Sequence, residues 1–143
     1  GLKANGVRLV NGNSTAVRMV AEGHATVCLT DTDDVWVAQR NGWPIDMVYP
    51  RHGQAGTLVF PNTAAVIRGG PHPAEARALV AFLLSEEVEE MLAASDSHNI
   101  PVHARVANKY PQYKVPDPMQ VDFAKAAEAI NPAVQAACKT LQD

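Results

Sequence analysis

The segment ATVCLTDTDD, residues 25–34, decides the expected fold, because an apolar run of strand type passes directly into an acidic helix start. Residues 25–29 are apolar or β-branched and predict a buried strand. Three carboxylates follow within four residues, at Asp31, Asp33 and Asp34. Polar residues between the end of a strand and the start of a helix are typical of ligand-contacting loops in α/β sheets.

The same alternation continues on both sides of this segment. Helices are expected over residues 14–22, begun by Asn13 or Ser14, and over residues 35–40. Strand-type patterns recur at four further places, residues 7–10, 45–49, 56–60 and 64–68. Strands and helices that alternate with short connections predict an α/β fold built on a sheet.

The second half of the chain has the start signals of several helices. Pro73 suits the first turn of one helix, and Ser85 caps a second that runs to about residue 94. Residues 95–118 contain four prolines and are expected to be irregular. Two last helices are expected over residues 121–130 and 132–141, the second with Pro132 in its first turn.

Composition excludes several classes of protein. Of the 143 residues, 47% are hydrophobic and 19% charged, and the net charge is −3 without a basic stripe, which argues against a nucleic-acid partner. No apolar run approaches the length of a membrane span. Cys28 and Cys138 could pair in a secreted protein, but two buried free thiols are favoured.

The ordered set of motifs resembles the extracellular solute-binding proteins of ABC importers, in particular the type 2, ferric-iron-binding group. The resemblance rests on GNST (residues 12–15), VAEG (20–23), LTDTDD (29–34), GTLV (56–59), ARALVAFLLS (76–85) and NIPV (99–102). These segments occur in the family's order and with similar spacing over nearly the whole chain. No single segment is diagnostic, whereas the ordered set is fairly specific.

The resemblance implies a two-lobed architecture with mixed sheets and a ligand cleft between the lobes. Residues 1–57 would belong to the second lobe, residues 58–112 would cross into the first, and residues 113–143 would return as helices. The first six residues look like a helix tail stopped by Gly6, so a C-terminal half of a longer protein is expected. The resemblance also implies a periplasmic or extracellular location, with a lipid anchor as one form of it.

The expected site lies at two helix starts. Asn13, Ser14 and Thr15 begin the first helix, where free backbone N–H groups and the helix dipole favour an anion, although ordinary capping explains the same residues. The resemblance implies that the asparagine position holds the anion that accompanies a bound metal ion. Thr32 lies among the acidic residues of the second helix start and belongs to the same expected ligand set.

The acidic cluster is the expected metal site. Asp31, Asp33 and Asp34 supply hard oxygen ligands suited to Mg²⁺, Ca²⁺ or Fe³⁺, although acidic residues also favour helix starts for the dipole alone. Ferric-binding members have two adjacent tyrosines where this chain has Asp33 and Asp34. Iron is therefore in question as the solute, and a divalent metal, a sugar or another polar or anionic solute remains open.

Two alternatives stand beside a transport receptor. Asp31-Thr32-Asp33 could hold the metal of a phosphoryl- or glycosyl-transferring enzyme, but no phosphate loop, nucleophile elbow or Cys/His pair accompanies it. An inert structural fragment is the other alternative. The expected partners are an ABC permease, the solute, a missing N-terminal half of the same protein, and a second copy bound through exposed strand edges.

Overall fold

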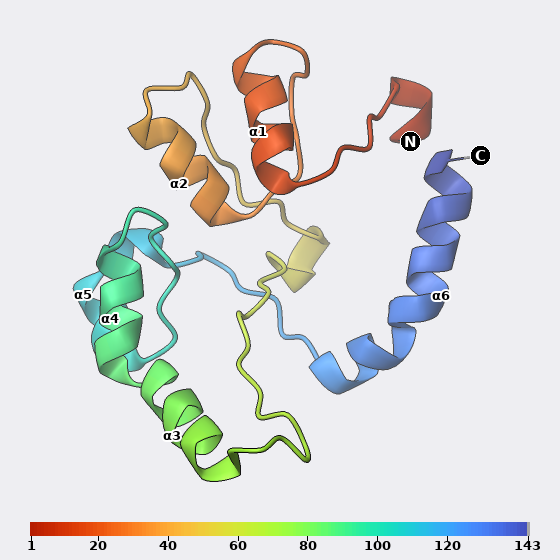
Figure 1. The fold of residues 1–143 in the computed structure, drawn as a ribbon. Helices are drawn as coiled ribbons and strands as arrows, with labels where there is room; N and C mark the ends of the chain where they lie inside the picture. Colours follow the sequence, from red (N-terminus) through yellow and green to blue (C-terminus); the bar gives the residue numbers. More distant parts are fainter. Residues whose placement is uncertain (143) are drawn as a thin grey trace.

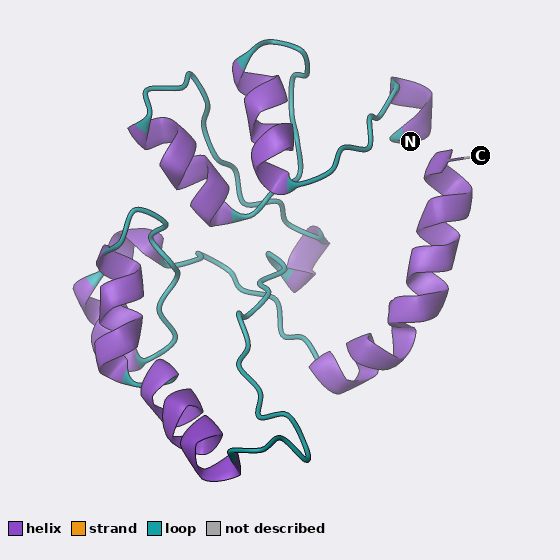
Figure 2. Ribbon diagram, viewed as in Figure 1, coloured by secondary structure: helices purple, strands orange, loops and turns teal. Residues whose placement is uncertain are grey.

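The computed structural model describes residues 1–142 and shows a helical protein (Figures 1 and 2). Its α-helices are α1 (Asn13–Ala21), α2 (Thr32–Arg40), α3 (Pro73–Leu83), α4 (Glu86–Ala94), α5 (Ala104–Lys109) and α6 (Phe123–Gln142). Three short 3-10 helices are η1 (Lys3–Asn5), η2 (Gly53–Ala55) and η3 (Pro111–Tyr113). Within residues 1–142 no strand belongs to a sheet, so the prediction of an α/β, mixed-sheet fold was wrong.

The correction concerns the five segments that were expected to be strands. Residues 7–10, 25–29, 45–49, 56–60 and 64–68 have no sheet partner, and only two isolated bridges occur among the described residues, both at Thr57. A strand forms only where another segment lies about 4.7–4.9 Å away and accepts its backbone hydrogen bonds. The apolar pattern of these segments does not supply that neighbour. A dimer through strand edges therefore loses its basis.

α1 and α2 pack against each other around a small apolar core. Val17 of α1 meets Val35 and Ala38 of α2, and all three side chains are buried. The extended segments that follow each helix cover this core, since Cys28 and Met47 pack against it. The pair is thus held by apolar contacts between elements that are near in sequence (Figure 1).

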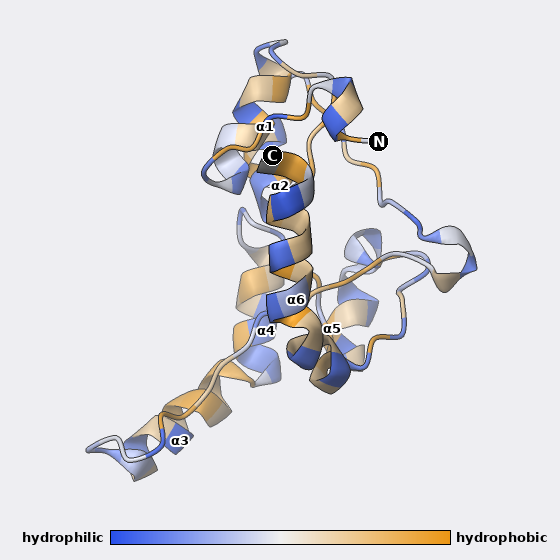
Figure 3. Cartoon of the chain, turned by 90° about the vertical axis from the view of Figure 1, so that its right-hand side faces the viewer, coloured by the Kyte–Doolittle hydropathy of each residue, from blue (hydrophilic) through white to orange (hydrophobic). Residues whose placement is uncertain are grey.

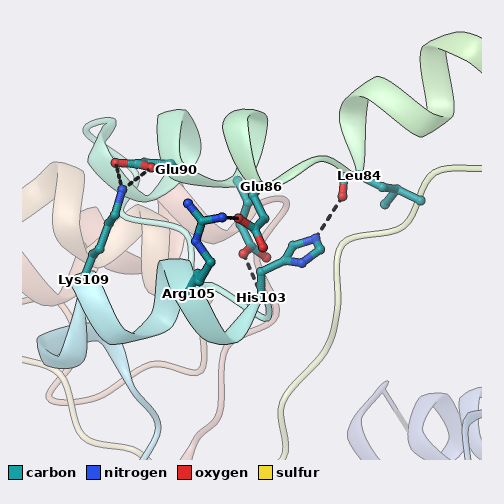
Figure 4. A network of polar contacts seen from close by, with 7 residues as sticks. Leu84, Glu86, Glu90, His103, Arg105 and Lys109 are labelled. Carbon is teal, nitrogen blue, oxygen red and sulfur yellow. Dashed lines mark hydrogen bonds and ion pairs between the residues drawn. The ribbon is translucent and has the colours of Figure 1, made fainter.

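α4 and α5 form a second pair, stabilised chiefly by polar contacts. Figure 4 shows Lys109 and Arg105 of α5 directed toward Glu90 and Glu86 of α4, with nitrogen–oxygen distances of 2.7 and 3.2 Å. Glu89 of α4 accepts the backbone N–H groups of Val102 and His103 at 2.7 and 2.8 Å. The start of α5 is therefore fixed by a carboxylate of the preceding helix.

An aromatic cluster joins the two helix pairs. The Trp36 ring of α2 lies edge-on to His98 and Tyr113, with ring centroids 5.5 and 5.6 Å away. The Tyr113 hydroxyl lies 2.7 Å from His98 Nδ1, and Arg40 at the end of α2 forms an ion pair with Asp96. α2 thereby contacts both α1 and the loop that leads from α4 to α5.

The centre of the chain contains a close crossing of two segments. Thr57 donates its N–H to the Asp117 carbonyl at 2.6 Å and accepts the Met119 N–H at 2.7 Å. Thr57 is buried, and Arg51 forms an ion pair with the Asp117 carboxylate at 2.6 Å. Gly56 has φ +89°, and a Cβ there would lie 2.4 Å from the Asp117 carbonyl oxygen, so only glycine fits.

α6 differs from the two C-terminal helices that the sequence predicts. One helix runs from Phe123 to Gln142 with Pro132 inside it, so the break expected before Pro132 does not occur. The expected irregular region 95–118 also contains α5 and η3. Figure 1 shows α6 apart from the other helices, and the hydropathy colours of Figure 3 show both apolar and polar residues along it. Every residue from 122 to 140 is exposed.

Candidate functional site

The start of α1 presents unused hydrogen-bond donors. Gly12 occupies the N-cap position with φ +100°, and having no side chain it cannot cap the helix. Asn13 and Ser14 are exposed, whereas Thr15 is half-buried. No hydrogen bond to the backbone N–H of these three residues occurs within the described chain. The sequence-predicted helix start is therefore present, and its first backbone N–H groups have no partner within the described chain.

The start of α2 brings the acidic residues to one place. Asp31 is extended at the N-cap, and its carboxylate makes no capping bond to α2. Asp33 is exposed and Asp34 is half-buried, and both lie in the first turn with the half-buried Thr32. The expectation that the helix begins at residue 35 was wrong by one turn, because the acidic residues themselves form that turn.

The two helix starts contact each other through their side chains. Asn13 donates from Nδ2 to Asp31 Oδ2 at 2.5 Å, and Ser14 donates from Oγ to Asp34 Oδ1 at 2.5 Å. These contacts span 18 and 20 residues of sequence. The side chains of Asn13 and Ser14, which were expected to hold an anion, therefore orient carboxylates instead. The first backbone N–H groups of α1, unpaired within the described residues, remain free to donate hydrogen bonds. One surface contains residues that the sequence assigned to two separate motifs.

The carboxylates are close enough to share one cation. Asp31, Asp33 and Asp34 can each direct an oxygen so that all three atoms lie within 4.8 Å of one another. Two oxygens on opposite sides of a Ca²⁺ ion lie roughly 4.6–5.2 Å apart, because each bond is about 2.3–2.6 Å long. No Lys, Arg or His of the described chain pairs with these three residues. Their negative charge is therefore left uncompensated by the protein.

Other basic and aromatic residues that could contact a solute lie elsewhere or serve other contacts. Arg51 pairs with Asp117 at the segment crossing, so its charge is used there. Tyr113 is buried and bonded to His98, which makes it a packing residue. Tyr49 is half-buried, and burial raises the pKa of its phenol, which disfavours a phenolate ligand.

Two buried polar atoms near the acidic residues were not anticipated. Thr30 Oγ1 and Trp36 Nε1 are buried and have no hydrogen-bond partner in the described part of the chain. Thr30 precedes Asp31, and Trp36 follows Asp34 by two residues. No spacing motif marks the contacts of Trp36 with His98 and Tyr113, because they join segments that are far apart in sequence.

The comparison with protein families decides the class of protein. The family model described as a bacterial extracellular solute-binding protein matches residues 2–127, most of the chain. The chain belongs to this family. Membership of this family gives the chain a solute-binding role in transport and an extracellular or periplasmic location. Comparisons with curated proteins and with solved structures gave no match.

The matched region of this solute-binding protein contains both helix starts of the site and ends inside α6. Among the residues described, none of the helices has the length and apolar character that a membrane crossing requires. The acidic surface is open to solvent, since Asp31 and Asp33 are exposed. A solute held at this surface would contact the oxygen atoms of α1 and α2 from one side.

Proposed function

We propose that this protein is the solute-binding component of an ABC importer and that Asp31, Asp33 and Asp34 contact a cationic solute, such as a metal ion, directly. The observation that carries this proposal is the set of three carboxylate oxygens within 4.8 Å without a basic partner. Like charges this close repel one another unless a cation compensates them. Oxygen-only ligands favour hard cations over soft ones.

Asn13, Ser14 and Thr15 have a supporting role in this proposal. The Asn13 amide and the Ser14 hydroxyl hold one oxygen each of Asp31 and Asp34, which leaves the other oxygens for the solute. The backbone amides of α1 stay available for an anion that accompanies the metal ion, because a helix start favours negative charge. Thr32 lies at the same surface and completes the proposed ligand set.

The solute would pass from this surface to a permease in the inner membrane, with the protein in the periplasm or anchored to lipid. The proposed lobes, residues 1–57 and 58–112 with a return at 113–143, meet near the crossing of Thr57 and Asp117. Because the acidic surface is open, we propose that a further protein surface, such as an N-terminal half of the same protein, covers the bound solute. Enclosure by a second surface would strengthen the charge interactions by excluding water.

Thermal unfolding with added cations tests the proposed solute class. A cation that binds only the folded protein at 100 times its Kd adds about 2.7 kcal/mol of stability, or roughly 5–10 °C in Tm for a chain of this size. We expect Ca²⁺, Mg²⁺ or Fe³⁺ to raise Tm, and Asp33→Asn to remove most of that rise. Glu87→Gln is the matched control, because Glu87 is an exposed acid in the first turn of α4.

The outcomes separate the proposal from its alternatives. An equal Tm rise in Asp33→Asn and in the unchanged protein would contradict the assigned site. The absence of any rise with the three cations would contradict a cationic solute and favour the inert fragment. Metal-dependent hydrolysis of a phosphomonoester or a nucleotide sugar that Asp33→Asn abolishes would instead support the enzyme built on Asp31-Thr32-Asp33.

A further inference from the structure

Three Asn-Gly pairs occur in the sequence, at residues 5–6, 11–12 and 41–42. Asparagine followed by glycine is prone to spontaneous loss of its side-chain amide. In this reaction the backbone nitrogen of the following residue attacks the amide carbon, and glycine has no Cβ to hinder the approach. The sequence alone therefore marks three equivalent positions for the same reaction.

The folded chain restrains two of these pairs in the same way. Asn5 is the last residue of η1, and Asn41 is the C-cap residue of α2. In both pairs the glycine N–H donates to the carbonyl three residues earlier, at 3.0 Å for Gly6 and 2.9 Å for Gly42. Each of these nitrogens must therefore lose a hydrogen bond before it can attack the neighbouring amide.

The third pair, Asn11-Gly12, lacks this restraint. Asn11 lies in a bend before α1, outside any helix, and the Gly12 N–H makes no hydrogen bond within residues 1–142. Gly12 is fixed to α1 through its carbonyl oxygen, which accepts the Ala16 N–H at 3.3 Å. Asn5, Asn11 and Asn41 are all exposed, so access of water does not distinguish them. The state of the glycine nitrogen does.

We propose that Asn11 is a site of spontaneous deamidation in the folded protein, where water converts it to aspartate and isoaspartate. The Gly12 nitrogen gives up its proton and bonds to Cγ of Asn11, the bond from Cγ to Nδ2 breaks, and the amide group leaves as ammonia. Water then opens the cyclic imide. Opening at the side-chain carbonyl gives aspartate, and opening at the main-chain carbonyl gives isoaspartate.

The product changes the start of α1. A carboxylate appears immediately before the N-cap residue Gly12 and adds one negative charge to the formal net charge of −3. The start of a helix favours negative charge, so the change is compatible with the fold. In isoaspartate the main chain also gains one carbon atom directly before α1. The reaction does not depend on the proposed solute or on the acidic residues of α2.

Peptide mapping by mass spectrometry tests the proposal on the unchanged full chain, kept folded at mildly alkaline pH. Asn11 is expected to convert roughly tenfold faster than Asn5 or Asn41, because only those two must first lose a hydrogen bond of their glycine. The other two pairs are thus matched controls within one molecule. Equal conversion at the three positions, or faster conversion at Asn5 or Asn41, would overturn the proposal.

Two further measurements separate the effect of the fold from that of the local sequence. In urea, where the glycine hydrogen bonds are lost, the three asparagines are expected to convert at comparable rates. A lead of Asn11 that persists unchanged in urea would overturn the structural basis. In the folded chain, Asn11→Gln is expected to remove the fast phase of ammonia release and to leave conversion at Asn41 unchanged. Persistence of that fast phase in the variant would contradict the assignment to Asn11.

Discussion

α2 and α4 both begin with a cluster of acidic residues, but the protein compensates the charge of only one. Glu86 and Glu90 of α4 meet Arg105 and Lys109, and Glu89 accepts two backbone N–H groups. The acids of α2 meet one amide and one hydroxyl, and no cation of the described chain pairs with them.

Under the proposed function, this difference separates a structural use of acidic residues in α4 from a binding use in α2. The same helix-start preference explains both clusters at the level of sequence. In α4 the carboxylates fix α5, so their removal should cost stability. In α2 they are close together and Asp31 and Asp33 are exposed, so we expect their removal to change binding and leave stability almost unchanged.

The largest effect on stability is expected from Glu89→Ala. The substitution removes two charge-assisted hydrogen bonds to the N–H groups of Val102 and His103, which should lower the free energy of unfolding by about 2–3 kcal/mol. Urea denaturation measures the change. Glu87→Ala is the control in the same helix, and equal effects of the two substitutions would show that the α4 cluster has no structural role beyond its helix.

A smaller loss is expected from removing both ion pairs that link α4 and α5. Arg105→Gln combined with Lys109→Gln should cost about 1 kcal/mol, because each pair is partly exposed and contributes about 0.5 kcal/mol. The loss should shrink in high salt, which screens exposed charges. Unfolding at low and high ionic strength measures both values. A loss that is independent of salt would contradict an ionic link.

The smallest effect on stability is expected from Asp33→Asn. Loss of the favourable interaction with the α2 dipole opposes relief of repulsion from Asp31 and Asp34, so the free energy of unfolding should change by less than about 0.5 kcal/mol. Urea denaturation without added metal measures the change. A loss comparable to that of Glu89→Ala would place Asp33 among the structural residues and remove the contrast with α4.

Local signals in the sequence predicted most helix starts. α1 begins within one residue of the expected position, and the Ser85 cap is confirmed by its bond to the Val88 N–H at 3.3 Å. α5 was missed because a helix of six residues is too short to be stable by itself. It depends on contacts with the preceding helix α4, in which Glu89 accepts the His103 N–H and Glu86 pairs with Arg105 of α5.

The candidate site was predictable in composition but not in geometry. The sequence shows Asn13 and Ser14 at one helix start and three acidic residues at another. The general preference of such residues for helix starts would account for either group. Their contact depends on Val17, Val35 and Ala38, whose packing sets the two helix starts side by side. The aromatic cluster of Trp36, His98 and Tyr113 had no sequence signal, because its members come from separate segments.

The sequence by itself determined the family, most of the helix starts and the acidic residues, because helix signals act over a few positions and the order of motifs can be read without coordinates. Only the tertiary structure decided that the strand-type segments stay unpaired, that α6 continues through Pro132, and that Asn13 and Ser14 meet Asp31 and Asp34. The physical reason is the range of the interactions. A helix makes its hydrogen bonds within itself, whereas a sheet or a shared site needs a partner that is distant in sequence.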